Sequence, residues 1–124
     1  MPWTDYKRRE PRDSKEKRMA LTRDFKLTVV ARAQRDPKFR QAVFAESISA
    51  YLAGDTLTGK AALRDLVNAT IGFEGLAVEI KKPSKSLHRM LAPRGNLSAK
   101  NFFDIVKALQ KRTRVRLRVT AELG

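Results

Sequence analysis

Helix-breaking residues divide this chain into short segments, and within each segment apolar residues recur every three or four positions. That spacing places them on one face of an α-helix, whereas Pro, Gly and Asp-Pro pairs begin or end helices. The breaks lie at residues 36–37, 54–55, 72, 82–83 and 93–96. The sequence therefore predicts an all-α fold of short helices. The predicted helices span residues 22–34, 37–53, 58–71, 73–80, 84–92 and 98–112.

The apolar residues of the three longest predicted helices indicate which side of each helix faces the core. For the helix over 37–53 they are Phe39, Val43, Ile48, Tyr51 and Leu52. For the helix over 58–71 they are Leu63, Leu66, Val67 and Ile71. The helix over 98–112 would bury in part Phe102, Phe103, Ile105, Val106 and Leu109. The two adjacent Phe residues could also stack on single-stranded bases, but their register favours the core.

The spacing of apolar residues changes near the C-terminus. Residues 114–119 read RVRLRV, which alternates basic and apolar residues. Because side chains alternate between the two faces of a β-strand, this pattern predicts a short strand with one Arg face and one aliphatic face. A lone strand is not stable, so we expect it to pair within the chain, across a dimer or with another protein.

Positive charge is concentrated in the second half of the chain. The sequence has 27 Lys and Arg against 13 Asp and Glu, a net charge of +14. Twelve of the basic residues lie between residues 81 and 118, where Asp104 is the one acidic residue, so this stretch carries +11. Neutralising the phosphates of a nucleic acid releases its condensed counterions, which makes such a polyanion the natural partner. The alternative is that the charge serves solubility alone.

The segment GFEGLAVEIKKPSKSLHRML (72–91) reads as two short amphipathic helices joined at Lys82-Pro83. In a helix-turn-helix, a small residue lets the second helix cross the first closely, and apolar residues hold the pair together. Ala77 is the small residue here. The apolar residues are Leu76, Ile80, Leu87, Met90 and Leu91. The same pattern also fits an ordinary helical core with a basic surface.

Polar residues form the outer face of the second helix in this pair. Lys85 and Arg89 lie four residues apart and share that face. Arg can bind guanine through two hydrogen bonds, and Lys can reach guanine acceptors or a phosphate. The helix N-terminus near Ser84 offers backbone N–H groups and a positive dipole end to a phosphate. The pattern therefore favours double-stranded DNA as the partner.

These motifs resemble the HigA-type antitoxins, also called addiction-module antidote proteins, which have a lambda-repressor-like fold. The resemblance runs from about Leu63 to Val119. It rests on ATIGFEGLA (69–77), KPSKSLHRML (82–91), RGN (94–96) and ALQKRTRVRLRV (108–119). The upstream TRDFKLTVVARAQRDPKFRQAV (22–43) is similar to the leading helices of one branch of these regulators. Members bind operator DNA as dimers and repress their own operon, and the antitoxins also mask an mRNA-cutting toxin.

The resemblance implies a sequence-specific autorepressor, with a homodimer partner and a small RNase toxin as a further partner. It implies that Ser84, Lys85, Ser86 and Arg89 contact bases or phosphates. It also implies that Asn96, Ser98 and Lys100 hold the DNA backbone. With the adjacent Lys82 and the outward-facing His88 added, the candidate DNA-binding residues are Lys82, Ser84, Lys85, Ser86, His88, Arg89, Asn96, Ser98 and Lys100.

Little in the sequence points to catalysis, a metal or a cofactor. The absence of Cys excludes a thiolate zinc site and a cysteine nucleophile, and His88 is the only His. The GxxxxGK pattern at 54–60 resembles a phosphate-binding loop, but Ala61 stands where that loop needs Ser or Thr. We therefore expect a protein that is not an enzyme and has neither metal nor cofactor.

The expected organisation is a lambda-repressor-like helix-turn-helix bundle with extra N-terminal helices and a short C-terminal β-strand. A flexible basic arm spans 1–20, a helical pair 21–56, and the helix-turn-helix DNA-binding domain with its strand 57–124. No apolar run approaches the ~20 residues of a membrane span, and no secretion signal is evident, so we expect a cytoplasmic protein that does not engage membranes. Met19 is an alternative translation start. Two other functions stay open: a protein-interaction module that neutralises a toxin, and an RNA-binding factor.

Overall fold

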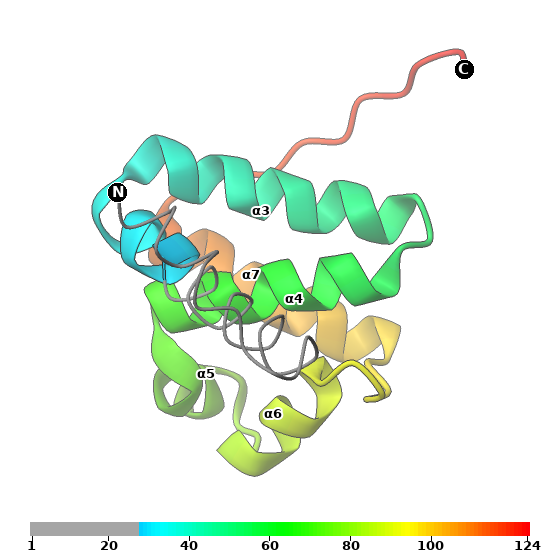
Figure 1. The fold of residues 1–124 in the computed structure, drawn as a ribbon. Helices are drawn as coiled ribbons and strands as arrows, with labels where there is room; N and C mark the ends of the chain where they lie inside the picture. The colour runs from blue at the N-terminus through cyan, green and yellow to red at the C-terminus, as the bar shows by residue number, and fades with distance from the viewer. Residues whose placement is uncertain (1–27) are drawn as a thin grey trace, which may run out of the picture.

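The computed structural model describes residues 28–124, and all regular secondary structure in this range is helical (Figure 1). Residues 28–35 are helical. The helices that follow are α3 (Pro37–Leu52), α4 (Thr56–Ala69), α5 (Gly72–Ile80), α6 (Ser84–Leu91) and α7 (Ala99–Thr113). The all-α prediction is confirmed for these residues. The predicted arm over 1–20 and the start of the helix predicted over 22–34 lie outside the described residues.

Side-chain caps explain why α3 and α4 begin where they do. Asp36 accepts hydrogen bonds from the backbone N–H groups of Lys38 and Phe39, each at 3.1 Å. Asp55 likewise accepts from the Thr58 N–H at 3.1 Å. Hydrogen bonds from the Thr58 side chain and backbone lower the pKa of the Asp55 carboxyl. The first N–H groups of a helix lack partners within the helix, so these caps define where the two helices begin. The start of α3 is the predicted one, whereas α4 begins at Thr56, before the predicted Thr58.

The helices surround one cluster of buried apolar side chains. α3 and α4 form an antiparallel hairpin, α7 crosses behind α4, and α5 and α6 lie below in the view of Figure 1. The short connection over 53–55, in which Gly54 adopts a φ of 85°, favours the antiparallel arrangement. The core cluster consists of Phe44, Leu63, Leu66, Val67, Phe73, Leu76, Leu87, Leu91, Ile105, Val106, Ala108 and Leu109. Helix α3 therefore shares its core with α4 to α7.

The buried side of α3 differs from the predicted one. Phe44, Ser47 and Ala50 are the buried residues of this helix, whereas Leu52 is 71% exposed. The predicted Val43, Ile48 and Tyr51 pack only at the margin of the core. Apolar residues lie on more than one side of α3, so their spacing did not define a single face. Ser47 can be buried because its hydroxyl donates to the Phe44 carbonyl oxygen at 2.7 Å.

The strand predicted over 114–119 is not formed, and residues 28–124 contain no other strand with which it could pair. Helix α7 ends at Thr113, its C-cap residue Arg114 has a φ of 60°, and the end of the chain extends away from the bundle (Figure 1). The alternation still has a structural effect. Val115 and Leu117 pack against the core cluster, while Arg116 and Arg118 are exposed. The Leu117 N–H donates to the Gln110 side-chain oxygen at 2.9 Å, which holds this segment against α7.

Candidate nucleic-acid interface

Helices α5 and α6 are joined by a tight turn made of Lys81, Lys82 and Pro83. Lys81 adopts a left-handed conformation with a φ of 58°, and the Lys82 N–H donates to the Ala77 carbonyl oxygen at 3.1 Å. The Ala77 carbonyl oxygen also accepts from the Lys81 N–H, so two donors close the end of α5. Pro83 has a φ of −61° and a ψ of 138°, so it turns the chain immediately before α6. The turn therefore fixes the angle at which α6 leaves α5.

The inner face of α6 consists of two leucines that are fully buried. Leu87 and Leu91 lie one turn apart, and both belong to the core cluster together with Leu76 of α5. Ala77 and Met90 pack at the margin of the cluster. Fully burying a Leu side chain contributes roughly 1.5–3 kcal/mol relative to leaving it exposed. The orientation of α6 about its own axis is therefore set by the two leucines.

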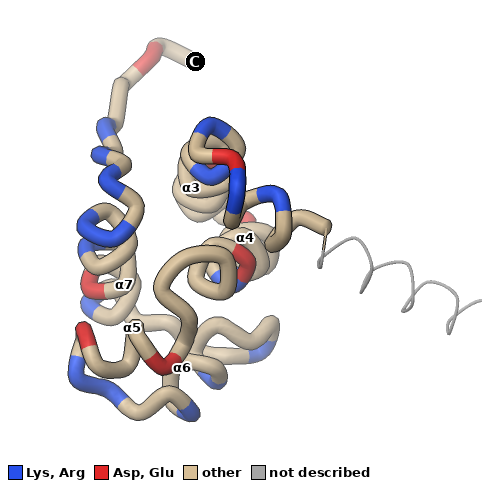
Figure 2. Tube along the Cα trace, turned by 90° about the vertical axis from the view of Figure 1, so that its left-hand side faces the viewer, with Lys and Arg blue, Asp and Glu red and all other residues tan. Residues whose placement is uncertain are grey.

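The outer face of α6 is polar and carries no negative charge. Lys85, His88 and Arg89 are exposed, while Ser84 and Ser86 are half-buried. Neither Lys85 nor Arg89 forms an ion pair with any residue in the described range 28–124. The tube view in Figure 2 shows basic positions at the α5–α6 turn and along the C-terminal part of α7. The lysine and arginine of α6 are thus available to a partner.

His88 is exposed, but its ring has a partner within the protein. It stacks on the ring of Phe73 in α5, with centroids 3.9 Å apart and an angle of 18° between the planes. Phe73 is 7% exposed, so the imidazole covers one side of a core residue. His88 is one of the candidate DNA-binding residues predicted from the sequence, and its ring packs α6 against α5.

The remaining candidate residues lie around α6 and have different surroundings. Lys82 is half-buried in the turn, and Asn96 is exposed in the loop before α7. The Ser98 hydroxyl oxygen accepts the Asn101 N–H at 3.2 Å and so caps α7. Lys100 pairs with Asp104 at 3.0 Å, and the Lys100 side chain is 80% exposed. The start of α7, with its Ser98 cap and the exposed Lys100–Asp104 pair, is therefore accessible beside the loop that follows α6.

Two cations of α4 hold the end of α6 and the loop after it, and the sequence did not predict either contact. Lys60, which is 6% exposed, donates through Nζ to the Gly95 carbonyl oxygen. One turn along α4, Arg64 donates through Nη1 to the Leu91 carbonyl oxygen. The last carbonyls of a helix have no partner within it, and cations are favourable there. The only signal in the sequence was the spacing of four residues, which places both cations on one face of α4.

Gly95 allows the loop after α6 to fold back against that helix. A Cβ atom at this position would lie 1.9 Å from the Arg89 carbonyl oxygen and 2.7 Å from that of Met90. Both neighbours are backbone atoms of α6 and cannot rotate away. Glycine is therefore required for the close approach that brings the Gly95 carbonyl to Lys60.

The described residues offer no metal site and no membrane span. Within residues 28–124, no three His, Cys, Asp or Glu side chains come together in a group that could hold a metal ion. In the same range, every helix is too short or too polar to cross a bilayer. Comparison of the chain with protein-family models, with characterised proteins and with solved structures finds no match.

Proposed function

We propose that this chain is a sequence-specific DNA-binding transcriptional regulator in which α5 and α6 form a helix-turn-helix and α6 is the recognition helix. The observation that carries the proposal is the division of α6 into two faces. Leu87 and Leu91 are fully buried, whereas Lys85 and Arg89 are exposed and make no ion pair within residues 28–124. A rigidly oriented helix with cations on its outer face is what the major groove admits.

The proposed roles follow from the position of each side chain. Arg89 and Lys85 would contact base edges or phosphates, and a two-bond Arg–guanine contact is worth about 1–3 kcal/mol of discrimination against the wrong base. Ser84 and Ser86 would donate to phosphates near the start of α6. Lys100, beyond the loop after α6, would contact the DNA backbone, which fixes orientation without reading sequence.

The proposal includes a homodimer that reads two half-sites. Residues 115–119 carry no regular secondary structure, and the described part of the chain holds no strand that could pair with them. We propose that the same segment of a second copy completes the pairing. The resemblance to HigA-type antitoxins extends the proposal to an autorepressor that also binds a small RNase toxin. Co-expression with a neighbouring RNase gene and co-purification would test that extension.

Selection of random duplex DNA by the purified protein, near physiological salt, tests the main proposal. We expect a palindromic motif with half-sites about 34–36 Å apart. Arg89→Ala should relax the preference at one base pair of each half-site, whereas Lys100→Ala should weaken all sequences alike. Both variants lose one positive charge, so each serves as the control for the other. A motif that is unchanged in Arg89→Ala would rule out α6 as the reading helix, and preference for structured RNA over duplex DNA would favour an RNA-binding factor.

A further inference from the structure

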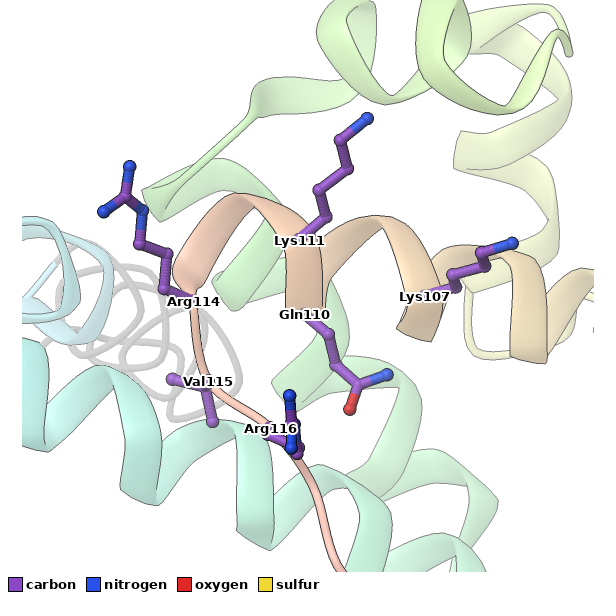
Figure 3. Close-up of a pocket in the computed structure, with 6 residues that line it drawn as sticks. All are labelled: Lys107, Gln110, Lys111, Arg114, Val115 and Arg116. Carbon is purple, nitrogen blue, oxygen red and sulfur yellow. The ribbon is translucent and has the colours of Figure 1, made fainter.

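Four cations surround a surface groove at the C-terminal end of α7, remote in sequence from α6. The groove has a volume of about 360 Å³ and is lined by these cations together with Gln110 and Val115 (Figure 3). We call the cations the C-terminal basic surface: Lys107, Lys111, Arg114 and Arg116. Lys107 and Lys111 project from the same side of α7, whereas Arg114 projects from the helix end (Figure 3). The groove is therefore open and positively charged.

Internal contacts hold the backbone that carries the two arginines. The Val115 N–H donates to the Thr113 hydroxyl oxygen at 3.2 Å, and the Leu117 N–H donates to the Gln110 side chain at 2.9 Å. Val115 and Leu117 pack against the core cluster. Arg116 lies between these two residues in the sequence and is exposed. The arginines are thus presented on anchored backbone, which reduces the entropy lost when a ligand binds.

The backbone conformation of Arg114 also favours a role in binding. Its φ of 60° lies in the left-handed region, which glycine adopts most easily at helix ends. A bulky residue with a strained backbone conformation indicates a function when its side chain lies in a candidate binding site. Here the side chain points away from the core and lines the groove.

The charges of this surface are only partly neutralised within the protein. Lys111 pairs with Glu79 of α5 at 3.3 Å, which also places the C-terminal ends of α5 and α7 next to each other. Lys107, Arg114 and Arg116 form no ion pair with any residue in 28–124. Lys81, at the end of α5, is exposed. The basic surface can therefore continue from α7 toward the turn that precedes α6.

We infer that the C-terminal basic surface is a second phosphate-binding site, which binds the backbone of duplex DNA outside the base pairs read by α6. The choice of duplex DNA as the polyanion rests on the proposed function. Arginine suits this task because its planar guanidinium matches the oxygens of a phosphate. A site of this kind adds affinity that is independent of sequence and depends strongly on salt.

The test compares two variants of the full chain that each lose two positive charges. Lys107→Gln/Arg114→Gly alters the surface, and Arg35→Gln/Lys38→Gln alters exposed cations before and within α3. Binding to a labelled random-sequence duplex is measured from about 50 to 200 mM salt. Each lost phosphate contact should reduce the slope of log K against log salt by about 0.9. Glycine suits the left-handed position, so thermal unfolding should show no loss of stability from Arg114→Gly.

We expect a slope smaller by about 2 for the surface variant, little change for the α3 variant, and the same selected motif for both. An unchanged slope, or an equal change in both variants, overturns the inference and leaves the role of α6 intact. If the wild type selects no motif but the surface variant still has a smaller salt slope than the wild type, the role of α6 is overturned and the basic surface stands. Polyglutamate, added at the same concentration of charge as the duplex, provides a competitor. If it displaces the duplex from the wild type but not from the surface variant, the site binds an acidic protein segment, and DNA is overturned as its partner.

Discussion

The Nζ atom of Lys60 on α4 donates a hydrogen bond to the carbonyl oxygen of Gly95, in the loop between α6 and α7. A second bond of the same kind joins Arg64 to the Leu91 carbonyl at the end of α6. Both donors are cations on one face of α4. The Leu91 carbonyl is one that a helix end leaves unpaired, whereas the Gly95 carbonyl lies in the loop that follows. Helix α4 therefore helps to position α6, the proposed recognition helix, although the candidate DNA-binding residues lie outside α4.

Lys60→Met should destabilise the protein, because the Gly95 carbonyl oxygen loses the charged donor of a partly buried hydrogen bond. We expect the free energy of unfolding to fall by about 2 kcal/mol, as is usual for a hydrogen bond to a charged group. Lys38→Met, at an exposed position of α3, removes the same charge and should change stability by less than about 0.5 kcal/mol. Urea denaturation of both variants makes the comparison. Equal losses in the two would mean that the Lys60 bond contributes nothing specific.

Gly95→Ala should disturb the end of α6, since the added Cβ would lie 1.9 Å from the Arg89 carbonyl oxygen. Backbone must shift to relieve that overlap, at a cost of roughly 2–3 kcal/mol. Gly54→Ala is the matched control, because its φ of 85° is unfavourable for Ala but nothing lies within 4 Å of the new atom. That strain alone should cost about 1 kcal/mol. Thermal unfolding would contradict the argument if Gly54→Ala proved the more damaging change.

Local features of the sequence were sufficient to predict the helices and part of the candidate site. Asp36-Pro37 and Lys82-Pro83 marked helix starts because caps and proline act on neighbouring residues. The spacing of Leu87 and Leu91 likewise predicted the buried face of α6. DNA binding by the outer face stays a prediction.

Features that depend on distant parts of the chain were not predicted. Lys60 bonds to a carbonyl 35 residues away, and no local pattern specifies such a partner. Cations are rarely buried, so the composition of α4 gave no reason to place Lys60 inside. The prediction of a strand over 114–119 was wrong for a related reason. A strand needs a neighbouring strand for pairing, and residues 28–124 contain none. The alternation over 114–119 still predicted which of Val115 and Arg116 would face inward.

Tyr51→Phe should stabilise the protein, since the Tyr51 hydroxyl is buried without a hydrogen-bond partner among the described residues. Removing an unsatisfied buried hydroxyl should gain about 1 kcal/mol. The ring can keep its contact with Phe102, whose centroid lies 4.6 Å away. Urea denaturation near pH 8 measures the difference, and a loss of stability in the variant would show that the hydroxyl has a partner after all.

The same pair of proteins should diverge at alkaline pH. Burial raises the pKa of Tyr51 above its usual value of 10.0, and the charge of Arg64 lowers it by a smaller amount. The folded state therefore holds the phenol proton more tightly than the unfolded state does. The resulting contribution to stability is fully present below the unfolded pKa and is lost as pH rises through the folded pKa. Tyr51→Phe has no phenol to titrate, so its free energy of unfolding should exceed that of the wild type by a growing amount above about pH 10. A difference in free energy of unfolding that stays constant up to about pH 11 would contradict this prediction.

Substitutions of His88 can separate packing from DNA contact. The imidazole stacks on Phe73 with a centroid separation of 3.9 Å. His88→Ala should therefore lower the free energy of unfolding by about 1 kcal/mol, the usual value of an aromatic pair. His88→Phe can keep the stack, so its stability should remain within about 0.5 kcal/mol of wild type. Selection of random duplex DNA by His88→Phe should then recover the wild-type motif. A stable His88→Phe protein that selects a different motif would instead show that the imidazole nitrogens contact the bases.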